Sequence, residues 1–524
     1  MPFIGQALHL DDAIFWDFAR NNLSHPFQQH IPNYFLMGRQ FGAFRDTHPA
    51  FDELYISLFM LAGGVGAPEA LFHLGFIIFP LIAGASMFFL GSRFTRGALP
   101  AALLLLSTPA VMVLSHTLMG DLPMTAFWLA ATAAYIYGTD RRSPPLLALA
   151  SILTTLTVFT GYQGLALILL LPAYAWIQTG RLRREAVLPA VLPVVAFAAF
   201  TWFNLAHYGA LPRFSHAQGL SVQGYSLVSR FQGMILQLSG ASVFPPFLAG
   251  AFMLRRRRYL ALPAVAAGAA LLGWRQLSPA YPPASAILFA IFIFTGACLL
   301  IGVFSEGLAQ AISRIRGRPP DRDFLFLALW LVSILAAVVV LLPDATTRYY
   351  LPVFAPMVLL MFREAEAAIS SRRLLTGLAL AAIGMSFVAG LWLSAADYRL
   401  AQAYKDFALS VNSRYHPTGT VWFVGEWGFR HYMEQEGYRY LPADSAEPKK
   451  GDLIIEPGLM QRPVAPSLLK RVRLADAPAA DWSMPVRVMS PPADAGFYGT
   501  YWGRLPFSIT SRPLERFKVY TVSS

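Results

Sequence analysis

Long apolar runs alternate with short polar stretches over the first three quarters of the chain. Runs such as Leu71–Leu90, Phe324–Leu342 and Leu374–Leu393 reach the roughly 20 apolar residues that cross about 30 Å of hydrocarbon. Twelve segments follow this pattern: 69–91, 97–114, 121–138, 146–160, 162–178, 186–207, 231–254, 260–274, 284–304, 324–342, 349–362 and 374–394. The pattern predicts a polytopic α-helical membrane protein with about 12 transmembrane helices, of which 146–160 and 260–274 are short enough to be tilted or broken.

Composition supports this class. The chain is 56% hydrophobic and only 13% charged, whereas soluble domains carry about 25% charged residues. The net charge of +12 comes from arginines in short clusters between apolar runs, which is typical of membrane orientation and excludes nucleic acid as a partner. The single cysteine, Cys298, leaves no intramolecular disulfide.

The loops alternate in charge. One set carries 18 arginines: 93, 96, 141, 142, 181, 183, 184, 255–258, 314, 316, 318, 322, 363, 372 and 373. The opposite set carries only Arg213, Arg230, Arg275 and Arg348. Because positive residues stay in the cytoplasm, the regions expected outside it are 1–68, 115–121, 207–230, 343–348 and everything after about 395. A chain that starts outside without a signal peptide in Met1–Gln6 suggests that a first transmembrane helix precedes this start site, in a parent with 13 helices. The alternative is an N-terminal loop that is translocated unaided.

The last part of the chain differs in character. Thr420–Gly425 and Asp452–Ile455 read as buried strands, and Phe429–Glu436 reads as a helix that ends at Gly437. We therefore expect two domains: a transmembrane module, 1–394, with a first extracytoplasmic loop 1–68, and a small extracytoplasmic α/β domain, 395–524.

Acidic residues gather at the expected outer side. Asp11 and Asp12 precede the helix-like stretch Ala13–Ala19, and Asp121 opens an apolar segment. Each could simply cap a helix by accepting free amide protons of its first turn. The alternative is a general base at the membrane surface, since neighbouring carboxylates repel and can raise the pKa of one of them.

Two further motifs share that side. His48-Pro49 before an apolar segment could be only a turn. Arg348 lies at a helix entrance in the segment from Pro343 to Pro356. It is either a snorkelling arginine or a clamp for a phosphate group.

The order of these motifs resembles the membrane-embedded GT-C glycosyltransferases. The branch most similar holds the protein O-mannosyltransferases and the aminoarabinose transferases of lipid A. The motifs, over roughly residues 5–395, are Asp-Asp with a helix, His-Pro-Ala-Phe, Gly66-Ala-Pro-Glu-Ala-Leu, Ser107-Thr-Pro109, Gly-Asp-Leu-Pro and Arg-Tyr-Tyr-Leu-Pro.

The resemblance implies roles for individual residues. Asp11 takes the position of the family's catalytic acid, Asp12 that of the glutamate that usually follows it, and Asp121 that of the second-loop acid. The resemblance maps His48 and the pair Arg348-Tyr349 onto the family's substrate-binding motifs, and Asp344, from the same segment as Arg348, is the other expected substrate-binding residue. His48-Pro49-Ala50 lacks the second proline of the family's motif, and no first helix precedes Asp11, so both departures weaken the match.

The resemblance also implies the reaction. The donor would be a sugar on a polyprenyl phosphate, the acceptor a lipid, glycan or protein hydroxyl, and the place the outer face of a bacterial inner membrane, in contact with membrane lipids. Arg348 and His48 would stabilise the departing phosphate, while Asp11 or Asp121 would orient or deprotonate the acceptor for inverting attack. No cofactor is required, and a divalent metal bridging the acids is an open alternative.

Other functions remain open from the sequence. A transporter or flippase for lipid-linked glycans would carry charges at the membrane midplane, whereas the apolar segments here are nearly free of charge. A lipid-linked glycan ligase or polymerase would share the charged outer loops. A non-enzymatic scaffold on the same body would tolerate the loss of Asp11.

Overall fold

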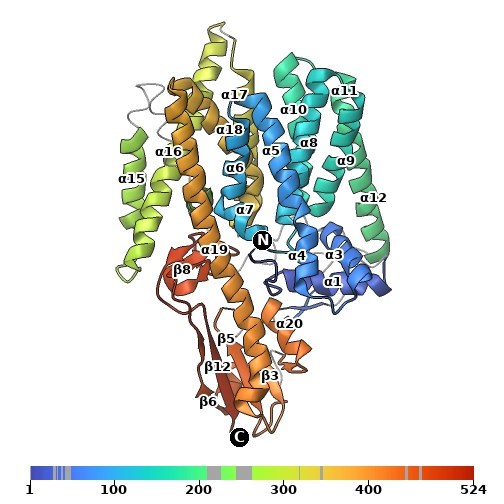
Figure 1. Cartoon of the computed structure of the whole chain (residues 1–524), viewed down its shortest axis with the longest axis vertical. Helices are drawn as coiled ribbons and strands as arrows, with labels where there is room; N and C mark the ends of the chain where they lie inside the picture. Colours follow the sequence, from blue (N-terminus) through green and yellow to red (C-terminus); the bar gives the residue numbers. More distant parts are fainter. Residues whose placement is uncertain are drawn as a thin grey trace.

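The computed structural model describes residues 2–26, 31, 34–36, 39–41, 49–208, 226–242, 262–275, 277–317, 319–342, 346–442, 447–459 and 463–523. Helices dominate the first 415 residues, and a sheet region follows (Figure 1). The predicted mixture of a helical body and a small C-terminal region with strands is confirmed at this level.

The first half of the helical body runs from residue 12 to residue 208. Its elements are α1 (Asp12–Ser24), β1 (Tyr34–Leu36), β2 (Arg39–Phe41), α3 (Phe51–Gly63), α4 (Glu69–Phe76), α5 (Ile78–Phe94), α6 (Ala98–Ser107), α7 (Pro109–Leu114), α8 (Asp121–Arg141), α9 (Pro144–Thr160), η1 (Tyr162–Ala166), α10 (Leu167–Thr179), α11 (Arg184–Val187), η2 (Leu188–Ala190) and α12 (Val191–Tyr208). In Figure 1, α1 and α3 lie at the lower edge of the helical body, between its long helices and the C-terminal strands.

The second half holds the longest helices. They are α13 (Leu227–Ser242), α15 (Leu262–Arg275), α16 (Pro283–Ile315), α17 (Arg322–Leu341), α18 (Leu351–Ala368), which follows the turn η5 (Thr347–Tyr350), and α19 (Arg372–Tyr415). Asp321 caps α17 by accepting the Phe324 N–H at 3.0 Å, and Ser371 caps α19 by accepting the Leu374 N–H. These local signals explain why the helices begin where they do.

Among the described residues, five helices are long and apolar enough to cross a membrane: Glu69–Phe94, Arg184–His207, Pro283–Ser313, Arg322–Leu341 and Arg372–Tyr415. The chain is therefore a multi-pass membrane protein. The count of about 12 spans stays a prediction, because several expected segments form shorter helices and 243–261 lies outside the described residues. The segment 97–114 is split into α6 and α7, since Pro109 has no N–H to continue the helix and Thr108 caps the new one.

The C-terminal strands form a six-stranded mixed sheet. The order is β4-β3-β5-β12-β6, with β7 also paired to β12. The bounds are β3 (Val421–Phe423), β4 (Arg439–Tyr440), β5 (Leu453–Pro457), β6 (Val472–Asp476), β7 (Ala479–Ala480) and β12 (Glu515–Val522). β3 runs parallel to β4 and β5, whereas β12 is antiparallel to β5 and β6.

Short elements complete this region. They are α20 (Trp427–Gln435), α21 (Pro466–Leu469), β8 (Val486–Arg487), β9 (Met489–Ser490), η6 (Pro491–Ala493), β10 (Ala495–Gly496) and β11 (Ser508–Ile509). β3, α20 and β5 fall where the sequence predicts two strands and a helix.

A single helix joins the two regions. α19 continues through residue 395, the expected domain boundary, and ends only at Tyr415, so it runs from the helical body down to the sheet (Figure 1). Its lower part packs on β12, where the rings of Phe407 and Phe517 stack at 3.8 Å between centroids. The sheet region is therefore fixed to the membrane body by a continuous hydrophobic core.

The N-terminal segment is held between α19 and the C-terminal region. Tyr498 Oη donates to Asp397 Oδ2 at 2.9 Å, and Gln6 Nε2 donates to the same oxygen at 3.2 Å. The Leu8 N–H donates to Tyr432 Oη at 2.7 Å. Gly428 allows the closest approach, because a Cβ at that position would overlap the carbonyl of Leu8. These contacts fix the start of α1.

Candidate functional site

An arginine and two carboxylates meet where η5, α8 and the start of α1 converge. Arg348 Nη1 lies 2.7 Å from Asp11 Oδ2 and 3.8 Å from Asp121 Oδ2. The side chains of Arg348, Asp11 and Asp121 are 12%, 24% and 7% exposed. We call these three residues the acid–arginine cluster. Asp11 is its most accessible member and Asp121 its least.

The remaining contacts of Arg348 set its orientation. Its guanidinium lies 5.2 Å from the centroid of the Tyr349 ring, and Nη2 donates to Tyr349 Oη at 3.4 Å. Met119 Sδ lies 3.4 Å from Nη1. Nε is buried and makes no hydrogen bond to any described residue. Nη1 thus donates to Asp11, while the N–H group of Nε is not used by any described residue.

Asp12 makes different contacts from those of its neighbour Asp11. It is fully buried and accepts the Leu118 N–H at 2.8 Å and the His9 N–H at 3.2 Å. Neither donor belongs to the first turn of α1, so the expected helix cap is replaced by a bridge between the N-terminal segment and the loop before α8. Burial raises the pKa of Asp12 well above its usual value, although the two N–H donors act in the opposite direction.

Sequence reasoning missed two acids in the first turn of α3. Asp52 and Glu53 are fully buried, and the Asp52 oxygens make no hydrogen bond to any described residue. Burial, with the charges of Glu53 and Asp121, raises the pKa of Asp52, and burial raises the pKa of Glu53 to about 8. The signal was available: these acids directly follow the His-Pro-Ala-Phe motif at the start of a helix.

Asp52 adjoins the acid–arginine cluster through a glycine. A Cβ at Gly120, the residue before Asp121, would overlap the Asp52 carboxylate. The starts of α3 and α8 therefore face one another, each with an acid in its first turn. Helix N-termini favour negative charge, which reduces the cost of gathering these carboxyl groups.

Two predicted substrate-binding residues, His48 and Asp344, lie outside the described residues. In the part of the chain that is described, no group of three or more His, Cys, Asp or Glu side chains is arranged to hold a metal ion. The expectation that no cofactor is required, with a divalent metal as an open alternative, therefore stays a prediction.

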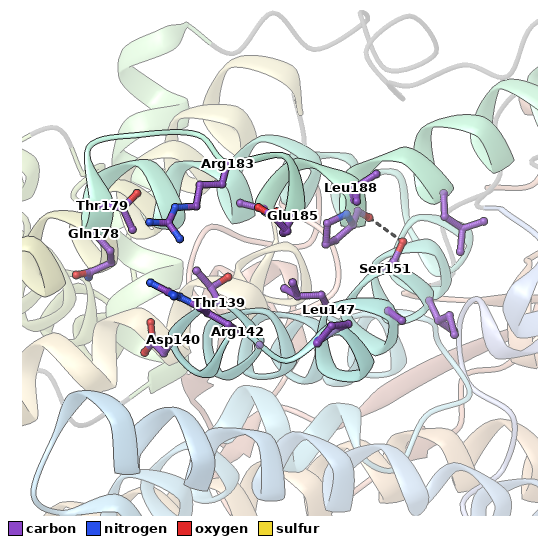
Figure 2. Close-up of a pocket in the computed structure, with 17 residues that line it drawn as sticks. Thr139, Asp140, Arg142, Leu147, Ser151, Gln178, Thr179, Arg183, Glu185 and Leu188 are labelled. Atoms are coloured by element: carbon purple, nitrogen blue, oxygen red, sulfur yellow. Dashed lines mark hydrogen bonds between the residues drawn. The ribbon is translucent and has the colours of Figure 1, made fainter.

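A large cavity lies at the other end of α8. It has a volume of about 1010 Å³ and is lined by residues from α8 to α12, among them Asp140, Arg142, Ser151 and Arg183 (Figure 2). The first lining residue on α8 is Gly138, which is 17 residues after Asp121 and therefore about 26 Å from it along the helix at 1.5 Å per residue. This cavity is therefore not part of the acid–arginine cluster.

No protein-family model and no curated protein matches the chain. Several solved structures resemble it at low identity. The oligosaccharyltransferase of Archaeoglobus fulgidus, in a form tethered to an acceptor peptide, is 13% identical with a TM-score of 0.49, covering 83% of this chain and 60% of that chain. ArnT from Cupriavidus metallidurans bound to undecaprenyl phosphate is 14% identical with a TM-score of 0.40, covering 99% and 95%.

The arabinofuranosyltransferase AftD from Mycobacteria is also 14% identical, with a TM-score of 0.40, and the match covers 99% of this chain and 38% of that one. The chain spans about 60% of the length of the oligosaccharyltransferase.

Proposed function

We propose that this protein transfers a sugar from a polyprenyl-phosphate donor to a hydroxyl group of a lipid, glycan or protein acceptor. The observation that carries the proposal is the acid–arginine cluster, in which one largely buried cation faces two carboxylates at helix starts. Such a pairing supplies a phosphate-binding cation and a proton acceptor within one small volume.

Arg348 is assigned to the donor phosphate. The leaving phosphate gains negative charge as the bond to the sugar breaks, and a preorganised donor stabilises that charge. The guanidinium has N–H donors beyond the one on Nη1 that holds Asp11, and these can donate to a phosphate oxygen. The adjacent Tyr349 ring restrains the guanidinium plane.

Asp11 is assigned to the acceptor. Its carboxylate is more exposed than that of Asp121, so an incoming hydroxyl reaches it more easily. The acceptor oxygen bonds to the anomeric carbon as the bond to the phosphate oxygen breaks on the opposite side, and the acceptor proton passes to Asp11. Attack from the opposite side inverts the configuration, and Asp121 helps to orient the groups.

The reaction is proposed for the extracytoplasmic face. The loops rich in arginine, including Arg93, Arg141 and Arg363, lie at the other end of the helices from Asp121. Protease added to intact spheroplasts should cut the C-terminal region and spare the arginine-rich loops. Protection of the C-terminal region in that experiment would contradict the proposed orientation of the protein in the membrane.

The decisive experiment is reconstitution with a polyprenyl-phosphate sugar and candidate acceptors. A transferase releases polyprenyl phosphate and yields a glycosylated acceptor, whereas a flippase moves the intact donor across the bilayer. Arg348→Ala should abolish release, and Arg399→Ala, which removes an exposed arginine on α19, should not. Mass spectrometry of cell-envelope glycans with and without the protein would then identify the product. Intact donor in every reaction would refute the proposal.

A further inference from the structure

The cavity at the arginine-rich end has rigid walls. Ser151 Oγ on α9 donates to the Pro189 carbonyl at 2.9 Å, and Tyr135 Oη on α8 donates to the Ala186 carbonyl at 2.7 Å. These bonds pin α8 and α9 to the α11–η2 segment on the other side of the cavity. The space is therefore a feature of the fold, held open between elements that are themselves tied together.

The lining is divided into a polar and an apolar end. Figure 2 shows Arg142 and Arg183 reaching toward the same end of the cavity, near Gln178 and Thr179, while Leu147 and Leu188 lie toward the other. At the apolar end Leu188, Ile152 and Leu192 are 62%, 51% and 45% exposed. Leu188 and Leu192 belong to a helical stretch apolar enough to cross a membrane, so this end opens toward hydrocarbon.

The polar end carries unbalanced positive charge. Asp140 is already engaged by Arg93 at 2.8 Å and by the hydroxyl of Tyr174. The guanidinium groups of Arg142 and Arg183 make no hydrogen bond or ion pair with any described residue. Glu185 is the one other acid among the lining residues, so two unpaired cations face a single unpaired anion.

We propose that this cavity binds an anionic membrane lipid, with the phosphate of the headgroup between Arg142 and Arg183 and an acyl chain along Ile152, Leu188 and Leu192. Arginine suits phosphate because its planar donors match two phosphate oxygens. A free phosphate ion would leave the apolar end unfilled, and a zwitterionic lipid would bring a second cation to the arginines. The site is independent of the proposed transfer reaction, because α8 separates it from Arg348.

The test measures lipid binding to the purified full chain by native mass spectrometry and by titration with short-chain lipids. Phosphatidylglycerol should bind at least about tenfold more tightly than phosphatidylcholine, because the choline cation of phosphatidylcholine is repelled by the two arginines, whereas phosphatidylglycerol carries a net negative charge. Arg142→Gln combined with Arg183→Gln should remove the preference. The matched control, Arg181→Gln with Arg184→Gln, changes two arginines of the same loop that do not line the cavity and should retain it.

A second pair of variants tests the apolar end. Ala148→Trp should fill the cavity and weaken binding by at least about tenfold. Leu149→Trp, at a neighbouring residue that does not line the cavity, should not. Equal binding of the two lipids, a preference that survives the double arginine variant, or inorganic phosphate that competes as well as the lipid would each overturn the proposal. Arg348→Ala should leave lipid binding unchanged, which separates this site from the acid–arginine cluster.

Discussion

Arg348 Nη1 and Asp11 Oδ2 lie 2.7 Å apart although 337 positions separate the two residues in the chain. The contact joins the turn before α18 to the segment before α1. Because the same nitrogen faces Asp121 at 3.8 Å, three distant parts of the chain share one charged cluster. Removing Arg348 leaves two carboxylates without their cation, whereas removing Asp11 leaves Arg348 with Asp121 alone. The three members can therefore be tested separately.

Asp11→Asn should lower turnover by about 10²–10⁴-fold, the range for loss of a positioned base. Donor binding should change little, since the phosphate is assigned to Arg348. Turnover and binding of polyprenyl phosphate, measured on the purified variant, separate the two effects. Asp406→Asn, at an exposed acid on α19, is the control and should retain activity. Full turnover in Asp11→Asn would leave Asp121 as the remaining candidate base.

Arg348→Ala should weaken binding of polyprenyl phosphate by at least about tenfold, because a charge-assisted hydrogen bond is lost. It should also destabilise the fold by about 3–5 kcal/mol, because Asp11 and Asp121 lose the cation between them. Calorimetric titration and thermal unfolding measure both effects. Unchanged donor binding in a folded Arg348→Ala protein would remove the phosphate clamp from the mechanism, and Arg399→Ala serves as the matched control.

Asp12→Asn should destabilise the protein by about 1–3 kcal/mol, since the amide nitrogen cannot accept one of the two backbone N–H groups that Asp12 binds. Asp12 is a positioning residue: the Leu118 N–H belongs to the loop that leads to Asp121. We therefore expect turnover to fall with donor binding preserved and the pH profile unshifted. A shifted pH profile would instead indicate that Asp12 exchanges protons during the reaction.

Gly120→Ala should displace Asp52, because the added methyl group would overlap its carboxylate. Overpacking of this kind costs about 1–3 kcal/mol, and the shift of the adjacent Asp121 should reduce turnover. Gly377→Ala is the control: it lies in α19 with open space around it, so it should be neutral or slightly stabilising. Thermal unfolding and turnover, measured on both variants, test whether Gly120→Ala is less stable and less active than the control. Equal behaviour would mean that the contact between α3 and α8 is unimportant.

The stability of the C-terminal region should fall as pH rises from about 5 to 8. Burial raises the pKa of Glu515 from its ordinary 4.5 to about 7, despite hydrogen bonds from Tyr404 and three backbone N–H groups. The folded state thus holds the proton more tightly than the unfolded state. The protonated Glu515 therefore contributes fully to the free energy of unfolding below about pH 4.5, and this contribution is lost as pH rises through about 7. The total change is about 3 kcal/mol.

Unfolding of the purified chain, followed across this pH range, measures the slope. Glu515→Gln should flatten it, since the amide does not ionise. Glu456→Gln changes a neighbouring glutamate that is paired with Lys518 at 3.1 Å, and it should leave the slope intact. An unchanged slope in Glu515→Gln would show that another group is responsible.

The sequence by itself determined the features that depend on neighbouring residues. Apolar runs of about 20 residues predict membrane helices because every backbone polar group must be satisfied within the segment. The short apolar runs at Val421–Phe423 and Leu453–Pro457 likewise predicted strands that are buried throughout. The order of the motifs identified Asp11, Asp121 and Arg348 as candidate site residues.

Only the tertiary structure decided how these elements are used. Asp12 looked like a helix cap but binds Leu118, because the loop before α8 folds over the start of α1. Sequence reasoning missed Asp52, because its burial against Gly120 depends on how the start of α3 packs on the start of α8. The cavity beside Arg142 and Arg183 exists only between packed helices. Burial and long-range charge pairing depend on contacts between distant segments, and local hydrophobic periodicity carries no information about them.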